Sequence, residues 1–198
     1  MRALVLPAVV AVTCAVVCVD ADVRASKRDA ATFGQKVALI NAHADKPTKQ
    51  GLKTTVSEAE VNSYLVYDSK DQLPAGVVEP SVAILGAGRL SGRAVVDLDA
   101  VRKSKNATSI WDPMSYLTGR LPVTAIGTLK TSNGAGQFFL ESAAVAGVPI
   151  PKLVLQEIVG YYSRTPSKPA GIGLDDPFAL PSRIREIQVE RGQAIIIQ

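Results

Sequence analysis

Residues 121–162 read LPVTAIGTLKTSNGAGQFFLESAAVAGVPIPKLVLQEIVGYY. Two apolar runs flank Ser132-Asn133-Gly134, and Asn and Gly tolerate the positive φ that a tight hairpin turn requires. This pattern predicts two antiparallel strands joined at the turn. Because proline at a first-turn position costs no helical hydrogen bond, Pro151 predicts the start of a helix that continues to Tyr162.

The predicted helix is apolar over most of its circumference. Its polar strip consists only of Lys152, Gln156, Glu157 and Gly160. A helix with so little polar surface needs cover on more than one side. We therefore expect the sheet to cover one side, and a further element or an apolar ligand to cover another.

The predicted hairpin carries apolar residues on both faces. Strict alternation places Leu121, Val123, Ala125 and Leu129 opposite Ile126, and Phe138, Leu140 and Ala144 opposite Phe139 and Val145. One explanation is a solid core. The other is a groove that holds an acyl chain, in which each buried methylene contributes about 0.8 kcal/mol.

The composition indicates one folded domain. The chain has 198 residues, of which 47% are hydrophobic and 20% charged, with a formal net charge of +4. Aromatic residues make up only 5%, so aliphatic side chains carry the burial, which favours strands. The basic residues are scattered and not interleaved with aromatics, which argues against nucleic-acid binding and allows weak attraction to anionic membrane surfaces.

The N-terminus has the layout of a secretory signal peptide. Arg2 precedes an apolar run that ends at Val19, and Val19 and Ala21 suit the positions before a cleavage site. We predict a signal peptide over residues 1–21, a single domain over residues 22–198, and a protein of the periplasm or cell envelope. An uncleaved membrane anchor and a lipoprotein are the alternatives.

Cleavage would also remove both cysteines. Cys14 and Cys18 lie inside the apolar run, so the mature chain would contain no disulfide, thiol nucleophile or cysteine metal site.

Outside the hairpin, the sequence predicts two further helices and four further strands. The helices run from Lys27 to Ala44 and from the capping-box residue Ser57 to Leu65, and the strands cover Ser81 to Leu85, Arg89 to Val101, Ile184 to Val189 and Ala194 to Ile197. Asn62 lies on no apolar stripe, so it is interpreted as a surface residue or a partner of the following loop. Six antiparallel strands and few helices predict an α+β fold.

Catalytic and metal-binding patterns are scarce. The single histidine, His43, lies near a predicted helix end, and Gly86-Ala87-Gly88 is followed at once by a strand and not by the helix that a dinucleotide site needs. The pairs Asp97/Asp99 and Asp175/Asp176 are interpreted as solvated carboxylates. We predict a non-enzymatic protein without metal or cofactor; an enzyme acting on lipid or cell-wall material would need one of these pairs in a cleft.

Several segments resemble known envelope proteins. SEAEVNSYL at 57–65 with LPAGV at 73–77, and IREIQVERGQAIII at 184–197, are similar to YceB-type periplasmic lipoproteins, and VPIP at 148–151 resembles the LmeA-like lipid-binding proteins. Both groups belong to the tubular lipid-binding (TULIP-like) class. The resemblance implies a half-barrel in which a curved antiparallel sheet of about six strands wraps a long apolar helix, together with lipid transport and no catalytic residues.

These inferences define a candidate binding groove between sheet and helix for a lipid or acyl chain. Its predicted lining residues are Leu90, Val96, Leu98, Val123, Leu129, Phe138, Leu140, Leu153, Val154, Ile158, Tyr161 and Tyr162. The loop from Thr165 to Asp176 is the predicted lid. The alternative function is a non-enzymatic envelope adaptor or assembly factor with a solid core.

Overall fold

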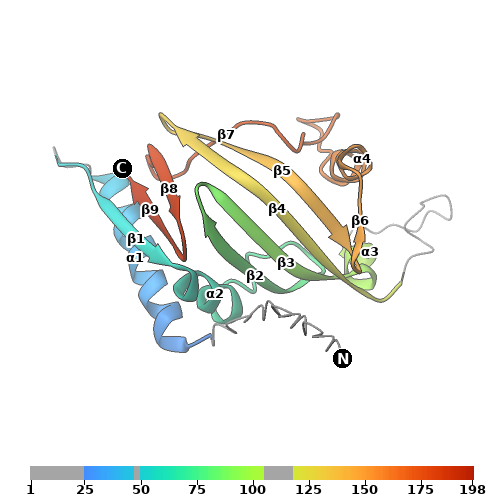
Figure 1. Cartoon of the computed structure of the whole chain (residues 1–198), viewed down its shortest axis with the longest axis horizontal. Coiled ribbons are helices and arrows are strands. Elements are labelled where there is room, and N and C mark those ends of the chain that lie inside the picture. The colour runs from blue at the N-terminus through green and yellow to red at the C-terminus, as the bar shows by residue number, and fades with distance from the viewer. Residues whose placement is uncertain (1–24, 47–49, 105–117) are drawn as a thin grey trace, which may run out of the picture.

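The computed structural model describes residues 25–46, 50–104 and 118–198, which contain four helices and nine strands (Figure 1). The elements are α1 (Lys27–Asp45), β1 (Lys53–Ser57), α2 (Glu58–Tyr67), β2 (Val77–Gly86), β3 (Arg89–Asp97), α3 (Leu98–Ser104), β4 (Arg120–Ser132), β5 (Ala135–Val145), β6 (Val148–Pro149), α4 (Lys152–Tyr162), β7 (Phe178–Ala179), β8 (Glu186–Glu190) and β9 (Gln193–Ile197). The predicted signal peptide, with Cys14 and Cys18, lies outside these residues.

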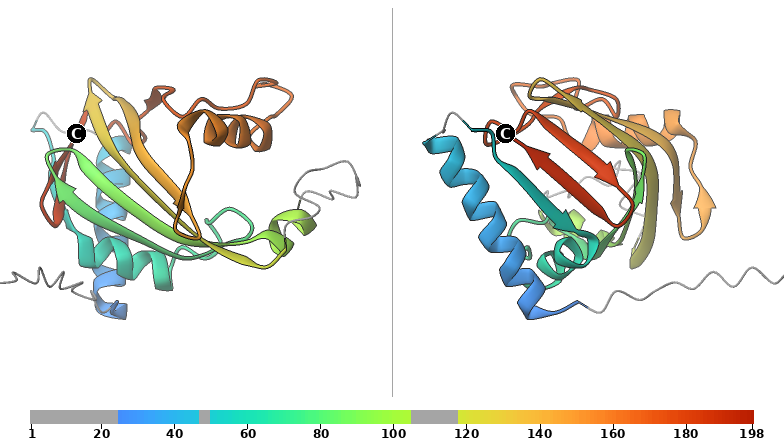
Figure 2. Two further views of the ribbon diagram at one scale, coloured as in Figure 1. Left: turned by 45° about the vertical axis from the view of Figure 1, so that its right-hand side comes forward. Right: turned by 60° about the vertical axis from the view of Figure 1, so that its left-hand side comes forward.

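A six-stranded antiparallel sheet forms the larger part of this α+β fold. Its strand order is β2-β3-β4-β5-β6, and β7 pairs with the start of β5. The predicted hairpin is confirmed, since β4 and β5 meet at Asn133 and Gly134, which have φ values of 50° and 81°. The sheet is open and visibly curved (Figure 2).

A second sheet holds the predicted C-terminal hairpin, whose turn meets β2 of the large sheet at an isolated bridge between Leu85 and Arg191. Its order is β1-β9-β8, because β1, a strand missed in the sequence, pairs with β9 along its whole length. The Thr131 hydroxyl in β4 also links the two sheets. It accepts a hydrogen bond from the Ile187 N–H in β8 at 2.8 Å and donates one to the Ile187 carbonyl at 3.0 Å.

The buried core lies at the same end of the molecule as the small sheet. Ile40 of α1 packs with Leu180 and Ile184, and Ile187 and Ile196 of the small sheet pack against them. In Figure 1, α1 and the small sheet lie at one end and α4 lies at the other. The principal hydrophobic cluster therefore leaves most of the large sheet outside it.

The predicted long strand from Arg89 to Val101 is wrong beyond Asp97. Asp97 accepts a hydrogen bond from the Ala100 N–H at 3.0 Å and lies 3.3 Å from Arg120 Nε, and α3 begins at Leu98. The bond from the Ala100 amide, and then the Arg120 guanidinium, lower the pKa of Asp97. A capping carboxylate that stays ionised stabilises the start of a helix. Asp97 therefore favours the start of α3 at Leu98 over a continuation of β3.

Helix α2 lies along the edge strand β2 and satisfies its backbone with side chains. Asn62 donates to the Val82 carbonyl at 2.8 Å and accepts from the Val82 N–H at 2.7 Å. Glu58 accepts from the Ile84 N–H at 2.6 Å. Asn62 is therefore neither a surface residue nor a partner of the following loop, because it replaces a neighbouring strand at the edge of the sheet.

The capping box of α2 predicts an acid-sensitive contribution to stability. Glu60 accepts from the Ser57 N–H at 2.8 Å and lies 2.6 Å from Lys36 Nζ. Burial alone raises the pKa of Glu60, but the Lys36 ammonium and the Ser57 amide outweigh it, so the pKa lies below its ordinary value of 4.5. A carboxyl group with a lowered folded pKa stabilises the fold above its unfolded pKa, and this contribution is lost as the pH falls through the folded pKa.

We therefore expect Glu60→Gln to cost about 1 kcal/mol of unfolding free energy at pH 7 and to weaken the loss of stability in acid. Urea unfolding followed by circular dichroism between pH 7 and pH 3 measures both effects. An acid profile identical to that of the unmodified chain would contradict this role of Glu60.

Candidate functional site

The two faces of the large sheet differ in chemistry. Residues paired across an antiparallel ladder share a face, so the strand register assigns each side chain. The polar face carries Arg89, Ser91, Arg93, Thr124, Ile126, Thr128, Lys130, Gln137, Phe139, Glu141, Ser142 and Ala144. The apolar face carries Val82, Ile84, Leu90, Gly92, Ala94, Val96, Leu121, Val123, Ala125, Gly127, Leu129, Phe138, Leu140, Ala143 and Val145.

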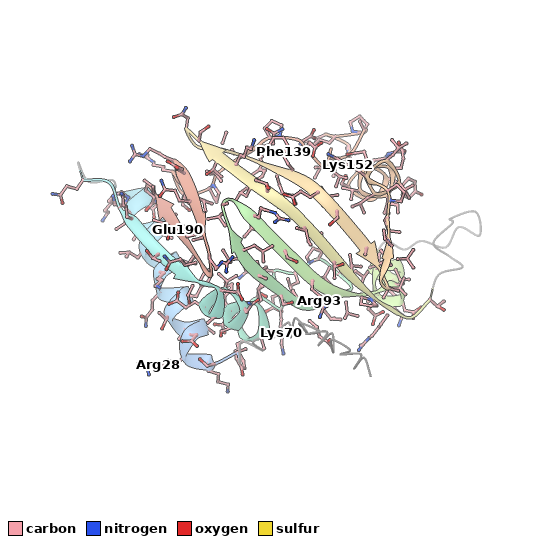
Figure 3. All side chains as sticks on the ribbon, in the orientation of Figure 1. Arg28, Lys70, Arg93, Phe139, Lys152 and Glu190 are labelled. Carbon is pink, nitrogen blue, oxygen red and sulfur yellow. The ribbon has the colours of Figure 1, made fainter. Side chains whose placement is uncertain are left out.

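Charged and aromatic groups on the polar face pair with one another. Glu141 accepts from the Thr128 hydroxyl at 2.6 Å and from Arg89 at 2.9 Å, and these two contacts lower the pKa of Glu141. Lys130 Nζ lies 5.0 Å from the centre of the Phe139 ring. Figure 3 labels Phe139 and Arg93 of this face. These groups are suited to water and not to an apolar ligand.

A β-bulge at Glu141 keeps the apolar residues of β5 on one face. Ile126 pairs with Ser142 while the next residue, Gly127, pairs with Leu140. This extra residue shifts the alternation by one position. The prediction that Ala144 shares a face with Leu140 is therefore wrong, since Val145 occupies that face.

The apolar face is open at its centre. A Cβ added at Gly92 would have no heavy atom within 4 Å, whereas one added at Gly127 would lie 2.5 Å from the Phe138 ring. Gly92 pairs with Ala125, so the floor at this point is made of small residues. The open strip, as we name it, consists of Leu90, Gly92, Ala94 and Val96 of β3 with Val123 and Ala125 of β4.

All six residues of the open strip are only partly buried. Toward the small sheet the face is closed, because Ile84 is buried there. The open strip is therefore apolar surface that the described residues leave accessible.

The structure brings together most of the predicted sheet residues. Leu90, Val96, Val123, Leu129, Phe138 and Leu140 all lie on the apolar face. Leu98 does not, because it is buried at the start of α3. The side chain of Tyr162 lies outside the described part of the chain.

Helix α4 is held by its polar side. Lys152 Nζ lies 2.6 Å from Asp175, Gln156 accepts from the Leu174 N–H at 2.7 Å, and the Ser163 hydroxyl accepts from the Ile172 N–H at 2.7 Å. All three partners belong to the predicted lid loop, which therefore packs on the polar strip of α4. Gln137 of β5 donates to the Asp175 carbonyl at 2.9 Å and ties the loop to the sheet.

The apolar side of α4 faces outward. Leu153, Val154, Ile158 and Tyr161, which we name the outer stripe, are between 42% and 75% exposed. The expectation that this side is covered is wrong for the described residues. At 11 residues, α4 is also not a long helix wrapped by the sheet, so the described elements do not show that part of the predicted half-barrel.

The carboxylate pairs considered as catalytic groups have structural partners. Asp97 caps α3, and Asp99 accepts from the Gly119 N–H at 3.2 Å. Asp175 pairs with Lys152, and Asp176 accepts from the Gly173 N–H at 2.8 Å. Within residues 25–46, 50–104 and 118–198, no three His, Cys, Asp or Glu side chains gather in a way that could hold a metal ion.

None of the helices in the described ranges combines the length and the hydrophobicity that crossing a membrane requires. Comparisons of the chain with protein-family models, curated proteins and solved structures find no match. The apolar surfaces of this chain are therefore the features that bear on its function.

Proposed function

We propose that this chain binds a lipid or another apolar ligand on the apolar face of the large sheet, and acts as a non-enzymatic, exported carrier of the cell envelope. The observation that carries this proposal is that the apolar face of the large sheet has open space at its centre, above Gly92. Contiguous exposed apolar surface is uncommon on soluble domains and is typical of ligand or partner sites.

The dimensions and chemistry of the open strip suit an acyl chain. Four alternate residues of β3, about 6.6 Å apart along the strand at a rise of about 3.3 Å per residue, provide an apolar track beside Val123 and Ala125. An alkyl chain laid on this track needs no hydrogen-bonding partner, and each methylene that it removes from water contributes about 0.8 kcal/mol. The larger side chains of Leu90 and Val96 stand at the two ends of the open strip, and the small residues Gly92 and Ala94 lie between them. This arrangement leaves room for an acyl chain above the small residues.

The architecture and location form part of the same proposal. A curved, open antiparallel sheet with an apolar face is what a TULIP-like half-barrel would contribute to a lipid site. The signal-peptide pattern of residues 1–21 supports export. The loop from Thr165 to Asp176 is attached to α4 and, through Gln137, to the polar face of β5. That face is opposite the open strip, so these contacts give no support to the predicted lid.

Native mass spectrometry of the protein purified gently from an envelope fraction tests the proposal. We expect a bound lipid at about one per chain, and uptake of a fluorescent fatty acid after the lipid is stripped. A ligand-free mass without fatty-acid uptake would contradict the proposal and favour the adaptor with a solid core.

A further inference from the structure

Exposed apolar side chains concentrate around α4. The large hydrophobic residues exposed in this region are Val148, Leu153, Val154, Ile158, Tyr161 and Ile172. They come from the start of β6, from α4 and from the loop that packs on α4. This surface lies at the end of the molecule opposite α1 (Figures 1 and 2), away from the buried cluster around Ile40.

One side of α4 departs from the pattern of an ordinary surface helix. It exposes the outer stripe together with Glu157, while Leu155 and Val159 are partly buried. A surface helix in water buries its apolar side and exposes its polar side. Here Lys152, Gln156 and Ser163 bind the loop, while the outer stripe faces outward. The loop contacts fix this orientation, so the exposed stripe is a built feature of the fold.

We propose that α4 docks on the surface of an anionic lipid bilayer, with the outer stripe inserted among the lipids. A helix that lies in the membrane interface combines an apolar stripe with basic residues at its margins. Lys152 is paired with Asp175, so the positive charge of this surface is concentrated at Arg164 and Lys168, just beyond the C-terminal end of α4. The three basic side chains, Lys152, Arg164 and Lys168, are all exposed.

The C-terminal end of α4 has the chemistry of the lipid headgroup region. The Arg164 guanidinium lies 5.4 Å from the centre of the Tyr161 ring. Tyrosine is enriched at membrane interfaces because its ring is apolar and its hydroxyl is polar, and arginine extends from there toward headgroup phosphates. Anionic lipid complements the positive charge of Arg164 and Lys168, whereas a neutral bilayer would be bound through the outer stripe alone. Binding to anionic bilayers should therefore be tighter.

Flotation with vesicles of phosphatidylcholine, with and without phosphatidylglycerol, tests the docking. We expect the unmodified protein to bind the anionic vesicles more tightly. The double variant L153S/I158S should bind both vesicle types at least about tenfold more weakly. The double variant R164Q/K168Q should lose about tenfold on anionic vesicles only.

Two residues elsewhere provide a matched control. Leu39 of α1 and Val66 of α2 are 52% and 42% exposed, so L39S/V66S removes apolar surface of similar exposure from another region. This variant should bind vesicles like the unmodified protein. An equal loss of vesicle binding in L153S/I158S and in L39S/V66S would show that general hydrophobicity, and not α4, drives binding, and would overturn the proposal.

Since the apolar run near the N-terminus can itself bind vesicles, a local measurement is also required. Hydrogen–deuterium exchange of the full chain should show slower exchange in peptides covering residues 148–164 when anionic vesicles are added. Unchanged exchange there would overturn the proposal. The proposal would also be overturned if sedimentation equilibrium showed a dimer that L153S/I158S converts to a monomer. A second copy of the chain, and not a membrane, would then cover the outer stripe.

The docking is independent of ligand binding on the sheet. L153S/I158S should still carry the ligand detected by native mass spectrometry, because the open strip lies on β3 and β4. Loss of vesicle binding with retained ligand separates the two sites, and a ligand-free protein that still binds vesicles through α4 would contradict only the proposed function.

Discussion

Phenylalanine in place of Gly92 should abolish ligand loading while the protein remains folded. No heavy atom lies within 4 Å of the position that a Cβ would occupy, so the new side chain leaves the strand without a clash at its Cβ. Phenylalanine also has high strand propensity. The ring would cover the floor between Leu90 and Ala94 and exclude an acyl chain. Native mass spectrometry and fluorescent fatty-acid uptake measure loading, and thermal unfolding measures the fold.

Arg93→Phe is the matched control for this substitution. Arg93 is the next residue along β3 and is exposed on the polar face, so the same ring enters the same strand on the opposite side. Arg93→Phe should load ligand like the unmodified chain. Normal loading of Gly92→Phe, or equal loss in both variants, would exclude the open strip as the binding site.

Asn62→Asp should lower the free energy of unfolding at pH 7 by about 2 kcal/mol. Aspartate keeps the shape of asparagine and can still accept from the Val82 N–H. It cannot donate to the Val82 carbonyl, which lies 2.8 Å from the present amide nitrogen, and an ionised oxygen there would repel the carbonyl. Urea denaturation followed by circular dichroism measures the change.

Gln72→Glu makes the same amide-to-carboxylate change at an exposed residue near α2. Within the described ranges the Gln72 side-chain amide bonds only the Tyr64 hydroxyl, at 3.0 Å, so this variant should change stability by less than about 0.5 kcal/mol. Similar losses for Asn62→Asp and Gln72→Glu would mean that the bonds to Val82 contribute little.

The elements that the sequence predicts well have local signals. The hairpin between β4 and β5 is encoded by Asn133 and Gly134, the start of α4 by Pro151, and the start of α2 by Ser57 and Glu60. Each signal acts within a few residues of the structure it specifies, so no knowledge of distant contacts is required. The alternation of β3 likewise predicts its apolar face as far as Val96.

The features that the sequence does not predict depend on distant partners. β1 is a strand because β9, about 140 residues later in the chain, pairs with it. The bulge at Glu141 follows from the pairing of β5 with β4 and leaves no mark in a pattern of alternation. The role of Asn62 depends on an edge strand 20 residues away.

In the candidate site, too, some features follow from local sequence and others depend on distant contacts. Alternation suffices to group Leu90, Val96 and Val123 on one face. The orientation of α4 is not predictable from its own residues, because both sides of the helix are possible inner sides. The backbone of Ile172 and Leu174 decides it by bonding Ser163 and Gln156, so the side predicted to line the groove faces outward.

The sealing of β2 by α2 also determines how this protein would aggregate. An unpaired edge strand recruits strands of other chains, and the segment Val82-Ala83-Ile84-Leu85 is uncharged and rich in β-formers. In the folded chain Asn62 bonds both backbone groups of Val82, and Glu58 accepts from the Ile84 N–H. The Ile84 carbonyl accepts from the Gly192 N–H in the turn between β8 and β9, at 2.8 Å. Fibril nucleation at this segment therefore requires both the ten-residue helix α2 and the turn between β8 and β9 to detach from β2, so conditions that loosen both would expose an edge of β-forming residues while the rest of the sheet is still folded.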